Sequence, residues 1–399
     1  VIGTQRMKKL VSLLLLITLM LSAVLAACGG NSGDVSADAS AGNSQSGGSA
    51  STDESSPIIG APSDDPAVSG DDTSDTSSSS TGGNEYEFKG IIFTEDYRAV
   101  EPFGGSYENG QLFARYLNRY RHFLGDDINI YNMIIPTAAA YYMPEKYESQ
   151  YGGKQLDKID YVYEWLDGVT PVDIYDITAE HKNDEEEIYF RTEHHWTQYG
   201  AYWAAKKFAE IAGVPFEADL SKYTYGGKFY EDGSPMPFLG SLYSQTQQQI
   251  LKDHPDKFFY YEYPGEYTME MYSYDFKELK RTKDSCYMYV SDDLPSAWYM
   301  IFMDGDNYSI KINSDVKNGR TCVVFKDSFG NALVPMLLSS FETIYAIDIR
   351  KFPINAIDFI KEVGATDVLF AVCAFTPMGS NYQYVETIRT MGGKYLWEE

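Results

Sequence analysis

This chain is poor in histidine, cysteine and basic residues, which limits the chemistry that it can carry. Its 399 residues include 5 His, 4 Cys and 32 Lys and Arg against 58 Asp and Glu, for a net charge of −26 at pH 7. Such an acidic balance argues against nucleic acid or an anionic membrane surface as a partner. No Cys–His spacing typical of a structural zinc site is present in the sequence.

The sequence also lacks a hydrophobic run that is long enough to span a membrane. Its apolar stretch, 10–21, is shorter than the roughly 18 residues that a spanning helix needs. Met7-Lys8-Lys9 precedes the stretch, and Leu25-Ala26-Ala27-Cys28 follows it. This order resembles a bacterial lipoprotein signal and predicts a signal peptide over 1–27, with 1–6 lying before the natural start. Cys28 would then be lipidated and would anchor the protein to the outside of the bacterial cell membrane; an ordinary secretory signal is the alternative.

The next segment, 28–84, contains almost nothing that can form a core. From Gly29 to Asn84 it has no Lys, no Arg and no aromatic residue, but nine acidic residues. Such a segment cannot bury enough apolar surface to offset its ordering entropy, so we predict a disordered tether. As a flexible coil it would span roughly 40 Å.

Three cysteines remain beyond Cys28, and this odd number excludes a full disulfide framework. Cys322 and Cys373 lie within apolar runs, in Thr-Cys-Val-Val-Phe and in Leu-Phe-Ala-Val-Cys-Ala-Phe. They are predicted to be buried, inert thiols. The third is Cys286.

The remainder, 85–399, alternates short apolar runs with helical patterns, which predicts an α/β domain. The segment 214–315 is dense in Tyr, Phe, Asp and Gly and is predicted to be a β-rich or irregular insert. A helix over about 198–212 is the best-defined element, with Thr197 as its cap and Gly213 at its end. Strands are expected at 90–94, 128–136, 172–177, 187–190, 321–325, 343–347 and 367–375, and further helices at 106–123, 156–166, 331–340 and 354–362.

Ser328 lies where an apolar strand gives way to a helix, in Lys326-Asp327-Ser328-Phe329-Gly330. A hydroxyl at such a turn projects from the carboxyl edge of a sheet, where open α/β folds bind ligands. The backbone N–H at a helix start is also a ready donor to an oxyanion. A serine in this place that merely caps the helix is the alternative.

Glu193 and His195 are separated by one residue, just before the predicted helix. In an extended stretch their side chains point the same way, so the carboxylate can orient the imidazole, and His194 would point away. Two solvated histidines on a surface turn are the alternative. Adjacent ligands rarely converge on one ion, so no metal site is expected here.

Together these segments resemble a known family. Glu193-His194-His195-Trp196-Thr197 with a following helix, and Lys326-Asp327-Ser328-Phe329-Gly330-Asn331 downstream, resemble the DHHW family of bacterial surface proteins. That family is similar to the alginate O-acetyltransferase (AlgJ/AlgX-like) branch of the SGNH hydrolases. The resemblance also covers 134–137 and 238–243 and implies a three-layer α/β sandwich with a mostly parallel sheet.

The resemblance implies a catalytic triad in which Ser328 is the nucleophile, His195 the base and Glu193 the acid. Glu193 replaces the usual Asp and is one methylene longer. Asn331 is a further oxyanion candidate, and Trp196 and Tyr199 are candidates for a sugar site or for burial against the sheet. No cofactor is expected.

The implied function is an O-acetyltransferase or acetylesterase that acts on a cell-envelope or secreted polysaccharide. The resemblance also implies a membrane-bound O-acyltransferase as donor partner. A glycan-binding or assembly lipoprotein that has kept the fold without catalysis is the alternative, which Glu193 and the aromatic-rich insert favour.

Overall fold

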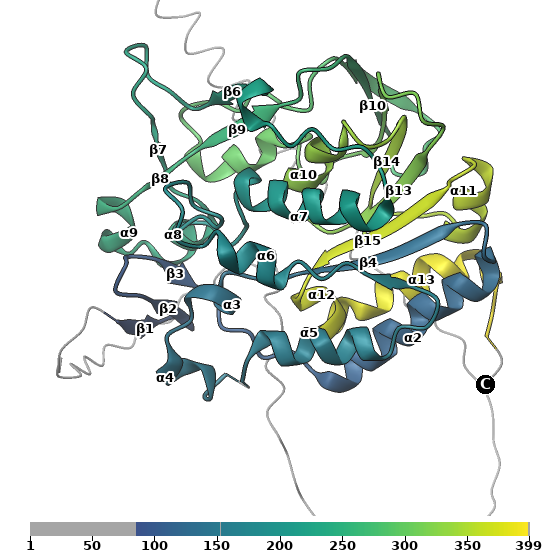
Figure 1. Ribbon diagram of the computed structural model, residues 1–399. Helices are drawn as coiled ribbons and strands as arrows, with labels where there is room; N and C mark the ends of the chain where they lie inside the picture. Colours follow the sequence, from purple (N-terminus) through teal and green to yellow (C-terminus); the bar gives the residue numbers. More distant parts are fainter. Residues whose placement is uncertain (1–84, 152, 398–399) are drawn as a thin grey trace, which may run out of the picture. The chain divides into compact units, whose positions relative to one another are not determined.

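A sheet of eight strands forms the centre of the computed structural model, which describes residues 85–151 and 153–397 (Figure 1). The predicted signal peptide, Cys28 and the predicted tether lie outside the described residues. All described residues belong to a single compact unit. Across the sheet the strands follow the order β11 (Leu279–Lys283), β10 (Tyr267–Tyr272), β12 (Ser309–Ser314), β14 (Thr343–Asp348), β13 (Thr321–Lys326), β15 (Asp367–Cys373), β4 (Asn129–Ile135) and β5 (Thr170–Pro171).

The sheet is mixed: four of its seven strand pairs are parallel, and three are antiparallel. The pairs β14–β13, β13–β15, β15–β4 and β4–β5 are parallel. The pairs β11–β10, β10–β12 and β12–β14 are antiparallel. The antiparallel strands β10, β11 and β12 come from the 214–315 region, so part of that region extends the central sheet.

Helices cover both faces of the sheet, because its strands present apolar side chains on each side. In β4, Tyr131, Met133 and Ile135 pack in one apolar cluster, and Ile130 and Ile134 pack in the other. The first cluster includes α7 (Gln198–Ala212) and α10 (Gly330–Leu333). The second includes α2 (Tyr107–Leu124), α5 (Gln155–Glu164), α11 (Ala356–Glu362) and α13 (Tyr384–Thr390). Figure 1 shows α7 on one side of the sheet and α2, α5 and α13 on the other.

Three expected elements differ in the structure. A strand over 172–177 is wrong: β5 ends at Pro171, and Asp173 accepts a hydrogen bond from the Tyr175 backbone at the start of helix α6 (Tyr175–Glu180). The expected strand at 187–190 is reduced to a single bridge between Tyr189 and Trp196. The expected helix over 331–340 is only α10 followed by the 3₁₀ turn η4 (Val334–Leu337), which contains Pro335.

Smaller elements surround the sheet. No helix among residues 85–151 and 153–397 has both the length and the apolar character that a membrane span requires. The remaining strands are β1 (Tyr86–Phe88), β2 (Ile91–Phe93), β3 (Ala99–Val100), β6 (Thr224–Gly227), β7 (Pro237–Phe238), β8 (Asp256–Lys257) and β9 (Phe259–Glu262). The remaining helices are α3 (Ala139–Tyr142), α4 (Glu145–Glu148), α8 (Ser241–Thr246), α9 (Gln249–Asp253) and α12 (Phe375–Met378), with 3₁₀ turns η2 (Leu220–Lys222), η3 (Pro295–Ile301), η5 (Ser380–Gln383) and η6 (Met391–Gly393).

The parallel strands β13, β15 and β4 end at the same edge of the sheet. Lys326 of β13 pairs with Ala371 of β15, and Cys373 at the end of β15 pairs with Ile135 at the end of β4. The segments that leave these strands therefore lie together at the carboxyl edge, where ligands bind in open α/β sheets. Ser328 is in one of these segments.

Candidate active site

A tight turn before helix α7 carries the Glu-His-His segment. Tyr189 bridges to Trp196, and the Phe190 backbone N–H donates to the His195 carbonyl. The Thr197 side chain accepts a hydrogen bond from the Gly200 backbone and so caps α7, as expected. Paired at its base and continued by a capped helix, the turn holds residues 191–194 at its tip.

A second turn, between β13 and α10, carries Ser328. Here the buried carboxylate of Asp327 accepts hydrogen bonds from the Phe329 backbone at 3.1 Å, the Cys373 backbone at 2.8 Å and the Thr376 hydroxyl at 2.8 Å. Asp327 therefore ties the Ser328 turn to the end of the neighbouring strand β15. Ser328 itself is only partly buried.

The two turns bring three predicted residues into one hydrogen-bonded chain. His195 Nε2 lies 2.8 Å from Ser328 Oγ, and His195 Nδ1 lies 2.8 Å from Glu193 Oε1. A carboxylate can only accept at Nδ1, so Nδ1 carries the hydrogen and Nε2 is free to accept the Ser328 hydroxyl proton. Glu193 and His195 are 2% and 6% exposed, so water competes little for these bonds.

Glu193 is held by the start of helix α8 as well as by the histidines. Its Oε2 accepts the Ser241 backbone N–H at 2.7 Å, and its Oε1 lies 2.9 Å from Ser241 Oγ. Gly240 packs against it: a Cβ on Gly240 would lie 2.6 Å from Glu193 Oε2 and closer still to Glu193 Cβ. The extra methylene of Glu relative to Asp is thus accommodated by a glycine and clamped by a serine.

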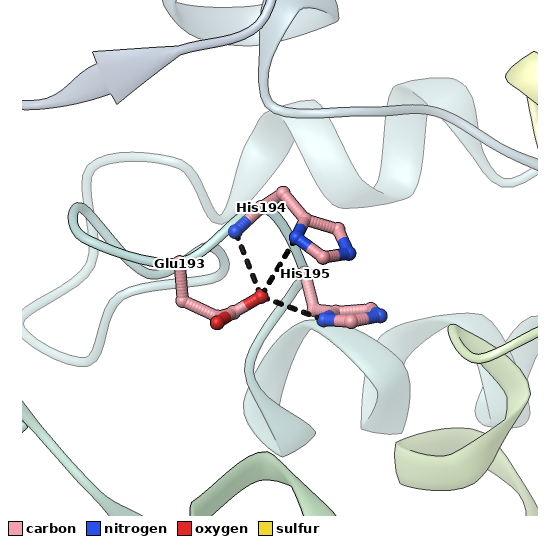
Figure 2. A group of neighbouring side chains, drawn as sticks. All are labelled: Glu193, His194 and His195. Carbon is pink, nitrogen blue, oxygen red and sulfur yellow. Dashed lines mark hydrogen bonds and ion pairs between the residues drawn. The ribbon is translucent and has the colours of Figure 1, made fainter. Parts of the chain in front are cut away.

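His194 does not point away, which corrects the expectation from an extended stretch. Its Nδ1 lies 3.0 Å from Glu193 Oε1 and 2.7 Å from Ser241 Oγ. Its ring centroid lies 3.8 Å from that of His195 (Figure 2). The reason is that the backbone turns here, and the alternation of side chains requires an extended strand.

The charges of these groups are set by one another. Burial alone would raise the pKa of Glu193, but His194 and His195 hold it well below its usual range. Burial alone would lower the pKa of His194, but the Glu193 carboxylate raises it to about 9. Burial, and then the charge of His194, lower the pKa of His195 to about 4. At neutral pH His195 is therefore neutral, as a general base must be, and His194 is charged.

The His195 ring is enclosed on both faces. Tyr299, from η3, stacks on it with centroids 3.8 Å apart and planes 5° apart, and His194 covers the other face. Tyr299 and Ser241 were not among the site residues predicted from the sequence. Ser241 lies in the 238–243 stretch that carries the family resemblance, whereas nothing in the sequence around Tyr299 marks it.

The other predicted site residues are placed differently. Asn331 is buried, and its side-chain amide donates one hydrogen bond, to Asp306 Oδ1 at 2.9 Å. Trp196 is fully buried and donates to the Phe329 carbonyl at 2.9 Å, so it holds the two turns together. Tyr199 donates to Asp184 and lines a cleft of about 660 Å³.

Glu193, His194 and His195 also form the one group in the described part of the chain whose ligand atoms fit a metal ion. These atoms lie within 4.8 Å of one another. Two of the three side chains are already engaged: Glu193 accepts from His195 and Ser241, and His195 contacts Ser328 through its other nitrogen. A bound zinc would also require a fourth ligand or water. The hydrogen-bonded arrangement is that of a serine–histidine–carboxylate triad.

Similarity to known proteins identifies the family of this chain. The sequence profile of the DHHW protein family matches residues 46–347. The crystal structure of a DHHW family protein from Eubacterium siraeum is 37% identical, with a TM-score of 0.68, and the match covers 77% of this chain and 98% of that one. Among curated proteins, no sequence matches this chain.

Two more distant structures match as well. Bacillus cereus PatB1 is 19% identical, with a TM-score of 0.58, over 75% of this chain and 100% of that one, and it has also been solved with a sulfonyl adduct. The O-acetyltransferase domain of Pseudomonas putida AlgJ is 14% identical, with a TM-score of 0.40, over 76% of this chain and 96% of that one. PatB1 shares the fold, and the AlgJ score is too low to support a conclusion about activity. By its sequence profile and its Eubacterium siraeum relative, this chain belongs to the DHHW family.

Proposed function

We propose that this chain is an O-acetyltransferase or acetylesterase that acts on a cell-envelope or secreted polysaccharide through Ser328, His195 and Glu193. We further infer that its fold is the three-layer sandwich of the SGNH hydrolases. The observation that carries the proposal is the unbroken hydrogen-bond chain from the Ser328 hydroxyl through His195 to the Glu193 carboxylate. A helix cap or a pair of solvated histidines does not require this chain.

In the proposed reaction, Ser328 Oγ attacks the carbonyl carbon of an acetyl ester while its proton passes to His195 Nε2. Glu193 accepts from Nδ1 and stabilises the charged imidazole. The tetrahedral intermediate collapses when the alcohol leaves with the proton from His195, and an acetyl ester remains on Ser328. Water or a sugar hydroxyl then attacks this ester while His195 takes the proton of the attacking group. The bond to Ser328 Oγ breaks, His195 returns the proton to that oxygen, and acetate or an acetylated sugar is released.

The setting of the reaction is part of the same proposal. Lipidation at Cys28 would place the site outside the cell membrane, where it meets polysaccharide. A membrane-bound O-acyltransferase would be the partner that supplies the acetyl group. The backbone N–H of Ser328 is the first candidate donor to the oxyanion.

Glycan binding without catalysis is the second candidate function, favoured by the cleft beside Tyr199. Its lining includes the aromatic side chains of Tyr199, Tyr225 and Phe259 together with the carboxylates of Asp184 and Glu185. Aromatic faces and polar edges suit a sugar. If the protein only binds glycans, Ser328, His195 and Glu193 would keep their hydrogen bonds, but the protein would not hydrolyse or transfer acetyl esters.

Covalent labelling separates the two functions. PatB1 was solved with a sulfonyl adduct, which supports a sulfonyl fluoride as the probe. We expect one adduct per chain in the wild type by intact mass, together with hydrolysis of a chromogenic acetyl ester. Ser328→Ala should abolish both because the nucleophile is gone. EDTA should change neither, since no step uses a metal.

The matched control is Ser149→Ala, which alters an exposed serine and should behave as the wild type. Labelling that survives in Ser328→Ala would contradict the nucleophile assignment. A wild type that is folded but unreactive would favour glycan binding.

A further inference from the structure

His194 has contacts that the proposed triad does not use. Its Nδ1 is occupied by Ser241 Oγ at 2.7 Å and by Glu193 Oε1 at 3.0 Å. Its Nε2 makes no hydrogen bond within residues 85–151 and 153–397. The side chain is 34% exposed, whereas that of His195 is 8% exposed. The site therefore offers one free, solvent-facing imidazole nitrogen.

That nitrogen faces the same way as the nitrogen that contacts the nucleophile. Figure 2 shows the Nε2 atoms of His194 and His195 on the same side, both directed away from Glu193. The ring centroids are 3.8 Å apart and His195 Nε2 lies 2.8 Å from Ser328 Oγ. A substrate carbonyl that is under attack by Ser328 would thus have a second imidazole N–H beside it.

We propose that His194 is a catalytic residue that presents its Nε2–H to the oxygen of the substrate carbonyl and binds the negative charge that develops there. This inference rests on the proposed function of Ser328 and deepens it. When Ser328 Oγ bonds to the carbonyl carbon, the carbonyl π electrons move onto its oxygen, and the proton of Ser328 moves to His195. His194 donates a hydrogen bond to that oxygen throughout and transfers no proton.

The groups around His194 keep it charged. Glu193 accepts from it, and the carboxylates of Glu101 and Asp327 also favour its charged form, which together bring its pKa to about 9. The imidazolium in turn disfavours a proton on His195, whose other charged neighbours are Glu193 and Asp306. A charged donor stabilises an oxyanion more strongly than a neutral one. Asn331, the other side-chain candidate, donates one hydrogen bond to Asp306.

The test compares His194→Ala and His194→Gln with the wild type in acetyl-ester hydrolysis and in sulfonyl labelling of the full chain. We expect kcat/KM to fall about 10²–10³-fold in His194→Ala, the usual cost of losing one oxyanion donor. His194→Gln retains an N–H donor without charge, so its kcat/KM should lie between those of the wild type and His194→Ala. The control His122→Gln changes an exposed histidine on α2 and should match the wild type.

The pH dependence of kcat/KM distinguishes oxyanion binding by His194 from a role in which His194 only holds Glu193 in place. Wild-type kcat/KM should rise through about pH 4, as His195 loses its proton, and fall through about pH 9, as His194 loses its charge. In His194→Gln the alkaline fall should disappear. The acid limb should move upward, because the positive neighbour that disfavours a proton on His195 is gone.

Two results would overturn the inference while the function of Ser328 stands. One is a kcat/KM of His194→Ala within about threefold of the wild type, against the 10²-fold expected for a lost donor. The other is an unchanged alkaline limb in His194→Gln, which also decides the matter if His194→Ala fails to fold. A wild type that neither hydrolyses the ester nor reacts with the probe removes the proposed function, and this inference with it.

Discussion

At the scale of single residues, the acid of the proposed triad is a glutamate whose length is matched to its surroundings. Glu193 reaches His195 with one oxygen and the Ser241 backbone with the other. It does so from the tip of a turn that is fixed by Trp196 and Thr197. Replacing the usual Asp by Glu is thus accompanied by a compensating clamp, and it does not by itself indicate a site that has drifted from catalysis.

This leads to a prediction for Glu193→Asp. Removing one methylene withdraws the carboxylate by about 1.5 Å, one carbon–carbon bond. It can then keep the His195 contact or the Ser241 contact, but not both. We expect kcat/KM for acetyl esters to fall about tenfold or more, and Glu193→Gln to cost on the order of 10⁴ because the imidazole is held in the wrong tautomer.

The control for that experiment is Glu278→Asp, at an exposed glutamate on the loop between β10 and β11. Activity in Glu193→Asp that equals or exceeds the wild type would contradict the match between Glu193 and its clamp. It would support the simpler view that Asp is the better acid on this fold.

At the scale of elements, the start of helix α8 is the least expected part of the site. Ser241 opens this helix, and the residue before it, Gly240, has φ −81° and ψ −156°, a conformation open to any residue. What requires glycine is space, since a side chain there would meet Glu193. The segment from 238 to 243 therefore positions the acid although it lies more than 40 residues further along the chain.

We accordingly expect Gly240→Ala to damage the site through crowding. The new Cβ would force Glu193 out of its place and weaken its bond to His195. Acetyl-ester kcat/KM should drop at least tenfold, and overpacking a closed site costs about 1–3 kcal/mol in unfolding free energy. Denaturant unfolding and esterase assays measure the two effects.

Gly104→Ala is the matched control, because a Cβ there would meet no atom within 4 Å. It should retain wild-type stability and activity. If Gly240→Ala behaved in the same way, the close packing of Gly240 on Glu193 would be refuted.

At the scale of the whole molecule, the central sheet determines where the candidate site forms, and the proposed anchor would determine where the protein is located. The sheet brings the carboxyl ends of β13, β15 and β4 together and so builds the place where Ser328 sits. The proposed anchor at Cys28 would decide where the protein is located. It lies outside the described residues, so it remains a prediction of the sequence.

We expect Cys28→Ser to move the protein from the membrane fraction to the soluble fraction, because the acyl chains can no longer be attached. Cell fractionation with immunoblotting measures this, and Ser32→Ala, a neighbouring change without a lipid, should stay with the membranes. Esterase activity per molecule should be unchanged. Membrane association that survives Cys28→Ser would exclude the lipid anchor.

The sequence by itself determined what depends on neighbours along the chain. The apolar face of 198–212, its Thr197 cap and its Gly213 end were predicted, and the structure has helix α7 with that cap and that end. The apolar runs at 321–325, 343–347 and 367–375 are strands β13, β14 and β15. Such patterns are local, since periodicity and caps act within a few residues. The prediction of a strand at 172–177 was wrong because the Asp173 side chain accepts a hydrogen bond from the Tyr175 backbone and forms a turn there, despite the apolar pattern.

Tertiary structure alone decided how distant residues meet. Ser328 and His195 are 133 positions apart, and their contact depends on a sheet edge that no local pattern encodes. The same holds for Tyr299 on the face of His195 and for Ser241 on Glu193. The direction of His194 was predicted wrongly because it depends on a backbone turn, and that turn is fixed by contacts with Phe329 and with the start of α7. The sequence could name Ser328, His195 and Glu193 as candidates through the family motif, and packing decided which partners support them and which nitrogen stays free.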